Sequence, residues 1–426
     1  MKKISLRNSI ARSLGIFCIF TLSIGFGSSQ SIGNIDNNYI IFAMLIPFYL
    51  IASVAFGGSY DRISKLTIFT VFISSIMIFI WIYGILIGLL YSNNPSFIIK
   101  NNAGIIGYFL VFPLLFIKYD IKIISILRIS GIIILLTTLV LKILTSFAGW
   151  DVTSAASQSI FGPFVGDGGV RWGRVFTYVQ YLVCVPIMYS LMSIKLKNTT
   201  YSKKLLHLTT VVLGLYTMFL VSMSKGMELA VIFSIFLTVI LCIRTSKLGW
   251  KLASFSTISL GALLAIYVFL FPNNPITENF FSAEDISNVA RYEQLNYILG
   301  DMKLFGNGLG ATILNYTRAE GQDYGFELSY VALFHKFGIL GFIPLASYVY
   351  TILMIIHLCG RNLSIRDAAS LMAAMSFLMP AIGNPGLFSL QEAITHALVL
   401  VAISRYAYKS IPETTEQGAN RLVRSL

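Results

Sequence analysis

Charged residues are scarce in this sequence, and cysteine is scarcer still. Only 12% of the 426 residues are Asp, Glu, Lys or Arg, against roughly 25% in soluble domains, which excludes an ordinary soluble protein. The four cysteines lie inside apolar blocks or at their ends, and no pair has C-x-x-C spacing. The sequence therefore indicates neither a disulfide framework nor a zinc site.

Apolar residues make up 56% of the chain and are arranged in long blocks. Blocks of about 20 residues can cross a hydrocarbon layer of ~30 Å as helices. We predict an all-α polytopic membrane protein with about twelve transmembrane helices, the first of them retained rather than cleaved as a signal peptide. The predicted spans cover residues 13–29, 39–56, 66–91, 103–118, 123–145, 175–194, 205–223, 227–243, 252–271, 328–357, 367–383 and 389–406. The span at 328–357 is expected to be tilted or broken, because Gly338, Gly341 and Pro344 interrupt it.

The Lys and Arg residues collect between alternate blocks, and this pattern indicates the orientation in the membrane. With a cytoplasmic N-terminus, 21 of the 31 basic residues fall on the cytoplasmic side and 7 fall outside. Acidic residues show the opposite bias. We therefore expect both termini in the cytoplasm. The same pattern accounts for the net charge of +13, so nucleic acid is not an expected partner.

Two of the predicted outer loops are long, at residues 146–174 and 272–327. They contain aromatic residues, which disordered segments tend to lack. We expect these loops to form a folded periplasmic cap that holds the functional site. Residues 1–409 are predicted to form a single transmembrane domain, and residues 410–426 a mobile cytoplasmic tail.

Basic residues in the outer loops run against the charge bias. Arg171 and Arg174 precede a span, Lys225 lies in a short turn between two spans, and Arg291 opens an amphipathic stretch. Taken singly, the arginine pair is explained by contact with lipid headgroups and Lys225 by an interfacial anchor. Arg291 is explained by a salt bridge to Glu293 or Asp301. Together they favour a site for a lipid-linked diphosphate, because Arg binds phosphate through paired hydrogen bonds and stays charged.

Three alternating glycines, Gly306, Gly308 and Gly310, lie in the larger outer loop. Their backbone N–H groups are candidates for contact with the same anion. A plain turn is the simpler alternative, because no strand–helix unit surrounds the run as in a dinucleotide-binding motif.

Glu327 is the carboxylate that the pattern singles out, at the predicted start of a span beside the larger loop. A carboxylate that is partly removed from water can serve as a general base. The alternative is an acid placed at a helix N-terminus because the helix dipole favours it. His335 lies deeper along the same predicted helix and is expected to be a hydrogen-bonded packing residue. No metal site is indicated.

Four segments, in this order along the chain, resemble the O-antigen polymerase and ligase superfamily of bacterial surface polysaccharide assembly. They are Arg171, Gly173 and Arg174 before a span, the turn Ser224-Lys225-Gly226, Arg291 followed by Gly306, Gly308 and Gly310, and Glu327 followed by Gly338 and Gly341. The resemblance covers roughly residues 171–341. Lys225 stands where the family usually has Arg. Glu327 stands where the ligase branch has His, which favours a polymerase.

The resemblance implies an inverting glycosyltransferase that joins undecaprenyl-diphosphate-linked repeat units on the periplasmic face of the bacterial inner membrane. Glu327 would be the catalytic base, and the diphosphate would be held without metal or other cofactor. The implied diphosphate-binding residues are Arg171, Arg174, Lys225 and Arg291. The candidates for stacking on sugar rings are Trp172, Tyr292 and Tyr324.

The expected partners are undecaprenyl-diphosphate-linked glycans, the lipid bilayer, a chain-length regulator and other polysaccharide-assembly proteins. The closest alternative function is an O-antigen ligase, which transfers glycan to lipid A core. A lipid-linked oligosaccharide flippase or transporter comes from a different class. Transporters usually carry charged residues within their spans near the bilayer midplane, whereas the polar residues here gather in two outer loops.

Overall fold

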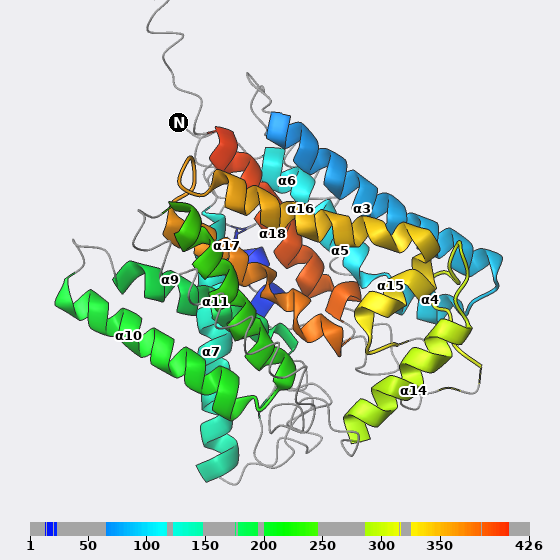
Figure 1. Ribbon diagram of the computed structural model, residues 1–426, viewed down its shortest axis with the longest axis horizontal. Helices are drawn as coiled ribbons and strands as arrows, with labels where there is room; N and C mark the ends of the chain where they lie inside the picture. Colours follow the sequence, from blue (N-terminus) through cyan, green and yellow to red (C-terminus); the bar gives the residue numbers. More distant parts are fainter. Residues whose placement is uncertain are drawn as a thin grey trace, which may run out of the picture.

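The computed structural model, shown in Figure 1, describes the greater part of the chain. The described residues are 13, 15–19, 21–23, 65–116, 122–147, 175, 178–194, 200–245, 286–314, 316, 325–384 and 386–408. The predicted spans at 39–56 and 252–271, most of the first span and the predicted tail lie outside these residues.

All regular elements in the described residues are helices, apart from two isolated β-bridges. The α-helices are α3 (Lys65–Leu90), α4 (Pro95–Asn101), α5 (Ala103–Phe109), α6 (Val111–Phe116), α7 (Ile123–Phe147), α9 (Cys184–Ile194), α10 (Tyr201–Tyr216), α11 (Lys225–Thr245), α14 (Ile286–Gly300), α15 (Ser329–Phe337), α16 (Phe342–Leu358), α17 (Ile365–Ala374) and α18 (Leu390–Tyr408). Short 3₁₀ turns are η1 (Tyr178–Val183), η3 (Gly338–Gly341), η4 (Met375–Leu378), η5 (Pro380–Ile382) and η6 (Gly386–Phe388), and η2 (Thr217–Val221) is a π-helical turn.

Six helical segments in the described part are long and apolar enough to cross a membrane. They are Leu66–Leu90, Ile123–Ser146, Tyr201–Val221, Lys225–Thr245, Ser329–Leu358 and Ile365–Ile382. Each overlaps a predicted span, and the shorter apolar helix Val179–Ile194 and α18 overlap two more. The coarser prediction, a helical membrane protein, is therefore supported.

α18 is the central helix of the bundle (Figure 1). It packs against α3, α5 and α16, and the residues from Ala397 to Ile403 are at most 2% exposed. The outer helices instead carry large apolar side chains on their exposed faces, such as Phe79 and Leu86 on α3 and Leu206 on α10. A helix that is apolar on its outer face as well as its inner face suits a lipid environment.

The predicted span at 328–357 is broken into α15 and α16 by η3. Gly338 ends α15 with a φ of +58°, a left-handed conformation that favours glycine. A Cβ at Gly338 would lie 2.1 Å from the carbonyl oxygen of Leu304. The loop before α15 therefore packs against this break only because residue 338 has no side chain. Pro344 lies in the first turn of α16, where a missing N–H is tolerated.

Candidate functional site

The structure describes part of the predicted site. The predicted site residues within it are Lys225, Arg291, Tyr292, Gly306, Gly308, Gly310 and Glu327. Those outside the described residues are Arg171, Trp172, Arg174 and Tyr324. The roles of these last four residues therefore stay predictions.

Arg291 and Glu327 form an ion pair between α14 and the turn that leads into α15. The Nε atom of Arg291 lies 3.3 Å from Oε2 of Glu327. The two side chains are 30% and 18% exposed, respectively, so both are sheltered and both can still be reached by a ligand. Arg291 thus has an acid partner, and that acid is Glu327 rather than Glu293 on its own helix.

The other guanidinium nitrogens of Arg291 make long hydrogen bonds. Nη1 donates to Oδ1 of Asn288 at 3.3 Å, and Nη2 donates to the carbonyl oxygen of Gly383 at 3.4 Å. Both distances exceed the usual N–H···O value of about 2.9–3.0 Å. A Cβ at Gly383 would lie 3.0 Å from Nε of Arg291, so a larger residue there would press on the guanidinium group. A phosphate oxygen is a stronger acceptor than either of these groups and can replace them.

The turn at residues 380–384 connects this ion pair with the start of α11. Gly226 packs so closely on the turn that a Cβ there would lie 3.0 Å from its backbone. Lys225 precedes Gly226 and is the first residue of α11. Arg291 donates to the same turn through the carbonyl of Gly383. Two separate segments, each with a residue singled out from the sequence, therefore lie against one turn.

Glu327 is positioned by hydrogen bonds of the two residues that follow it. The N–H of Leu328 donates to Oε1 of Gln294, a residue of α14, at 3.0 Å. The hydroxyl of Ser329, the first residue of α15, donates to the carbonyl oxygen of Asn384. Because one bond reaches α14 and the other reaches the 380–384 turn, the backbone next to the carboxylate is fixed on two sides.

The glycine run is a tightly packed turn. The φ angles of Gly306, Gly308 and Gly310 are +76°, +76° and +73°. A Cβ at Gly308 would lie 2.1 Å from the backbone nitrogen of Gly88 in α3. The N–H of Gly306 donates to the carbonyl of Lys303 and that of Gly308 to the carbonyl of Lys336, both at 2.9 Å. The N–H of Gly310 donates to Oδ1 of Asn101 at 3.1 Å. Since these groups already donate within the protein, the geometry favours the plain turn over the predicted anion contact.

His335 is fully buried and ties the glycine turn to α15. Its Nε2 lies 2.8 Å from Oδ2 of Asp301 and 3.0 Å from Nδ2 of Asn307. Beside it, the buried Nζ of Lys336 donates to the carbonyl of Ala311 and lies 4.4 Å from the centroid of the Phe326 ring. His335 is thus a hydrogen-bonded packing residue, as expected from its depth in the helix.

Aromatic side chains cover α14 beside the ion pair. Tyr292, the neighbour of Arg291, is 56% exposed, so its ring is accessible to a ligand. Further along, the rings of Tyr297 and Tyr316 lie 5.1 Å apart. Exposed aromatic rings present apolar faces with a polar edge, which suits contact with a sugar.

Glu392 is a candidate that the sequence analysis does not identify. It is 6% exposed in the first turn of α18. A Cβ at Gly386 would lie 3.3 Å from its Oε1, and its Oε2 has no hydrogen-bond partner in the part of the chain that the structure describes. Its position inside an apolar block is the pattern that could have identified it, because ionisable residues within membrane spans are usually functional. Gly383 and Asn384, by contrast, carry no local signal for their contacts with the ion pair and with Ser329.

The arrangement combines a carboxylate that can accept a proton with a guanidinium that can hold an anion. No group of three or more His, Cys, Asp or Glu side chains among the described residues could hold a metal ion. No protein-family model matches the chain, and no curated protein matches it either.

Proposed function

We propose that this protein is an O-antigen polymerase, an inverting glycosyltransferase that acts on lipid-linked repeat units. The observation that carries the proposal is the 3.3 Å contact between Arg291 and Glu327. A polymerase of this kind needs a base for a sugar hydroxyl next to a cation for a diphosphate. Both groups are present, both are partly exposed, and the start of α11 with Lys225 flanks the same turn.

In the proposed reaction, Glu327 removes the proton from a hydroxyl of the acceptor repeat unit while that oxygen attacks the anomeric carbon of the donor glycan. The bond between the anomeric carbon and the diphosphate oxygen breaks, and undecaprenyl diphosphate leaves with the electron pair. Attack from the face opposite the leaving group inverts the linkage. The donor glycan is then joined to the acceptor, which remains on its own lipid carrier.

Arg291 stabilises the negative charge that develops on the leaving diphosphate. A well-placed donor of this kind contributes ~3–4 kcal/mol to the transition state. The bonds from its Nη1 and Nη2 to Asn288 and Gly383 are long, so phosphate oxygens can take over both nitrogens while Nε stays near Glu327. Lys225, Arg171 and Arg174 are proposed as further cations for the same diphosphate, and Tyr292 as a stacking surface for a sugar.

The finer architecture belongs to this proposal as well. The protein would have about twelve spans, a periplasmic cap formed by residues 146–174 and 272–327, and both termini in the cytoplasm of a bacterium. Nucleotide sugars are absent outside the inner membrane, and the activated lipid diphosphate would supply the driving force there. A chain-length regulator and other assembly proteins would be its partners.

The proposal is tested by replacing the acid in cells that make the polysaccharide. We expect Glu327→Gln to reduce polymer by about 100-fold or more, since general bases contribute roughly 10²–10⁴-fold. Glu293→Gln is the matched control, because Glu293 is an exposed acid on α14 that lies outside the ion pair. Protein levels in membranes are measured for both variants. Long chains persisting in Glu327→Gln cells would remove this residue from catalysis.

A transporter of lipid-linked oligosaccharide is the second candidate, and the buried Glu392 favours it. Ionisable groups buried among membrane helices are typical of transport pathways. Gel profiles of a deletion strain separate the functions. Loss of a polymerase leaves core bearing one repeat unit. Loss of a transporter or of a ligase leaves bare core, and that profile would contradict the polymerase proposal.

A further inference from the structure

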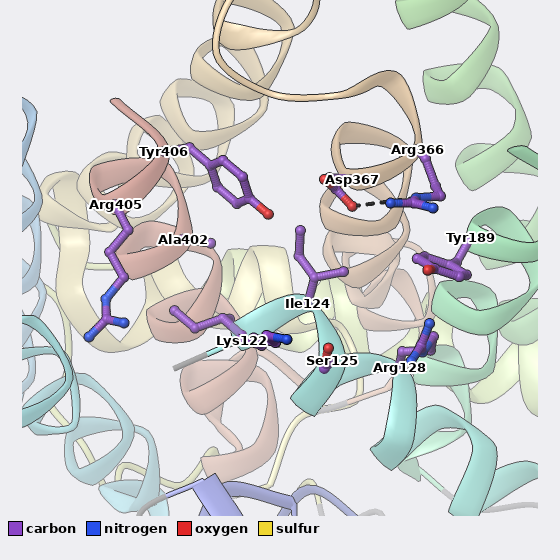
Figure 2. Close-up of a pocket in the computed structure, with 11 residues that line it drawn as sticks. Lys122, Ile124, Ser125, Arg128, Tyr189, Arg366, Asp367, Ala402, Arg405 and Tyr406 are labelled. Carbon is purple, nitrogen blue, oxygen red and sulfur yellow. Dashed lines mark ion pairs between the residues drawn. The ribbon is translucent and has the colours of Figure 1, made fainter. Parts of the chain in front are cut away.

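A cavity of about 290 Å³ lies at the opposite end of the bundle from the Arg291–Glu327 pair. Figure 2 shows that its walls come from α7, α9, α17 and α18. α18 begins with Glu392 in its first turn, close to Gly386, and runs for 19 residues, or about 28 Å. Arg405 and Tyr406, near its other end, border the cavity. Most of the thickness of a membrane therefore separates the cavity from the ion pair.

Basic side chains dominate the cavity wall. They are Lys122, Arg128, Arg366 and Arg405. Of these, Arg405 already donates through Nη2 to the carbonyl oxygen of Leu114, and its guanidinium group points away from the other three side chains (Figure 2). Asp367 is the single acid among the residues that line the cavity. The ring of Tyr189 lies between two guanidinium groups (Figure 2), with Cζ of Arg128 4.4 Å and Cζ of Arg366 4.9 Å from its centroid. The balance of charge in the cavity is thus strongly positive.

The protein does not use all the hydrogen-bonding groups of these arginines. Nε of Arg128 and Nε of Arg366 are buried, and neither has a hydrogen-bond partner among the described residues. Nε of Arg366 lies 3.7 Å from Oδ1 of Asp367, which gives attraction but is too long for a hydrogen bond. A buried N–H without an acceptor is unfavourable, and an anion in the cavity would supply acceptors.

Two helices also begin at this cavity. The first residues of α7 line it, as do Arg366 and Asp367 in the first turn of α17. A helix N-terminus carries a partial positive charge and attracts anions. The helix dipoles and the basic side chains therefore both favour an anion in the cavity. Apolar side chains, including those of Ile123, Ile124 and Ala402, complete the wall.

We propose that this cavity binds the phosphate group of an anionic phospholipid. Arg and Lys recognise phosphate oxygens through charge-assisted hydrogen bonds, and the apolar wall suits the glycerol and acyl part of a lipid. Basic pockets between membrane helices on the cytoplasmic side are typical sites for anionic headgroups. The bound lipid relieves the repulsion between the two guanidinium groups and so stabilises the packing of α7 against α17.

The test is to titrate lipid or phosphate into the purified full-length protein in neutral detergent and to measure the thermal unfolding midpoint at each concentration. The probes are short-chain phosphatidylglycerol, short-chain phosphatidylcholine and inorganic phosphate. We expect phosphatidylglycerol to raise the midpoint and the other two probes to have little effect. Arg128→Gln and Arg366→Gln should each weaken the apparent affinity by about tenfold, the loss of one charged hydrogen bond. Lys203→Gln, an exposed basic residue of α10 outside the cavity, is the control.

Asp367→Asn provides a test of the opposite sign. Removing the single acid of the cavity should tighten phosphatidylglycerol binding, a gain that misfolding cannot imitate. An unchanged or weaker affinity in this variant overturns the proposal even if neither arginine variant folds. A full shift with inorganic phosphate alone would identify a free ion as the ligand and overturn the lipid assignment. Equal shifts with phosphatidylcholine would overturn it as well.

Discussion

The close packing around Gly306, at the end of the molecule that carries the ion pair, requires a residue without a side chain. Its φ is +76°, and a Cβ would lie 2.4 Å from the carbonyl oxygen of Lys336. We expect Gly306→Ala to lower the free energy of unfolding by more than about 2 kcal/mol, from backbone strain and overlap together. The measurement is the thermal midpoint of the purified protein in detergent.

Gly300 is the matched control for this substitution. It ends α14, and nothing lies within 4 Å of the position that its Cβ would occupy. Gly300→Ala should leave the midpoint unchanged or raise it slightly, because alanine lowers the entropy of the unfolded chain. Equal losses in both variants would show that the close contact at residue 306 does not determine stability.

Single residues were predictable from the sequence where the chemistry of the residue type was informative. Arg291 stands out as a cation against the charge bias, and Glu327 stands out as a carboxylate at the predicted start of a span. The structure brings the two together. For the glycine run the sequence left both an anion contact and a plain turn open, because glycine serves close packing as well as ligand contact. The internal hydrogen bonds of the run favour the turn. Gly383 could not be identified, since its contact with Arg291 joins elements that are far apart in the chain.

At the scale of elements, the start of α15 determines where the proposed base lies. Ser329 joins it to the 380–384 turn through the hydroxyl donated to Asn384. We expect Ser329→Ala to lower the kcat of polymer synthesis about tenfold, because loss of one hydrogen bond of about 1–1.5 kcal/mol lets the carboxylate move. KM should stay near the wild-type value, which distinguishes this positioning role from a loss of binding.

The exposed Ser202 on α10 provides the control for this element. Ser202→Ala should keep the wild-type kcat, since its position is remote from α15. Both variants need membrane levels and unfolding midpoints close to those of the wild type. If Ser329→Ala retains full kcat, the hydrogen bond to the turn is unnecessary for placing Glu327.

Span positions were largely predictable because lipid imposes long apolar blocks, whereas interruptions within them depend on local chemistry. The break in 328–357 was readable from its glycines and proline. The span predicted at 103–118 instead consists of α5 and α6, separated at Leu110. Pro113 offers a physical reason, because proline cannot donate to the carbonyl four residues earlier, that of Phe109. The break therefore has a cause that is visible in the sequence.

At the scale of the whole molecule, the two sites lie at the two ends of one helix bundle. The ion pair lies near the start of α18 and the basic cavity near its end. α10 and its π-helical turn also run from one end of the bundle to the other. They extend over 21 residues from Tyr201 to Val221, and Val221 lies shortly before Lys225 at the end with the ion pair. Tyr201 and the proposed active site are therefore expected on opposite sides of the membrane.

This orientation is tested by cysteine labelling in spheroplasts with a maleimide that cannot cross the membrane. Leu314 is 85% exposed near the ion pair, and Tyr201 is 83% exposed at the far end. The charge bias predicts that Leu314→Cys reacts in intact spheroplasts and that Tyr201→Cys reacts only after permeabilisation. Background should be low, because Cys18, Cys184 and Cys359 are buried and Cys242 is half-buried. Labelling of Tyr201→Cys from outside would invert the topology, and it would place Glu327 in the cytoplasm, where no periplasmic polymerase could use it.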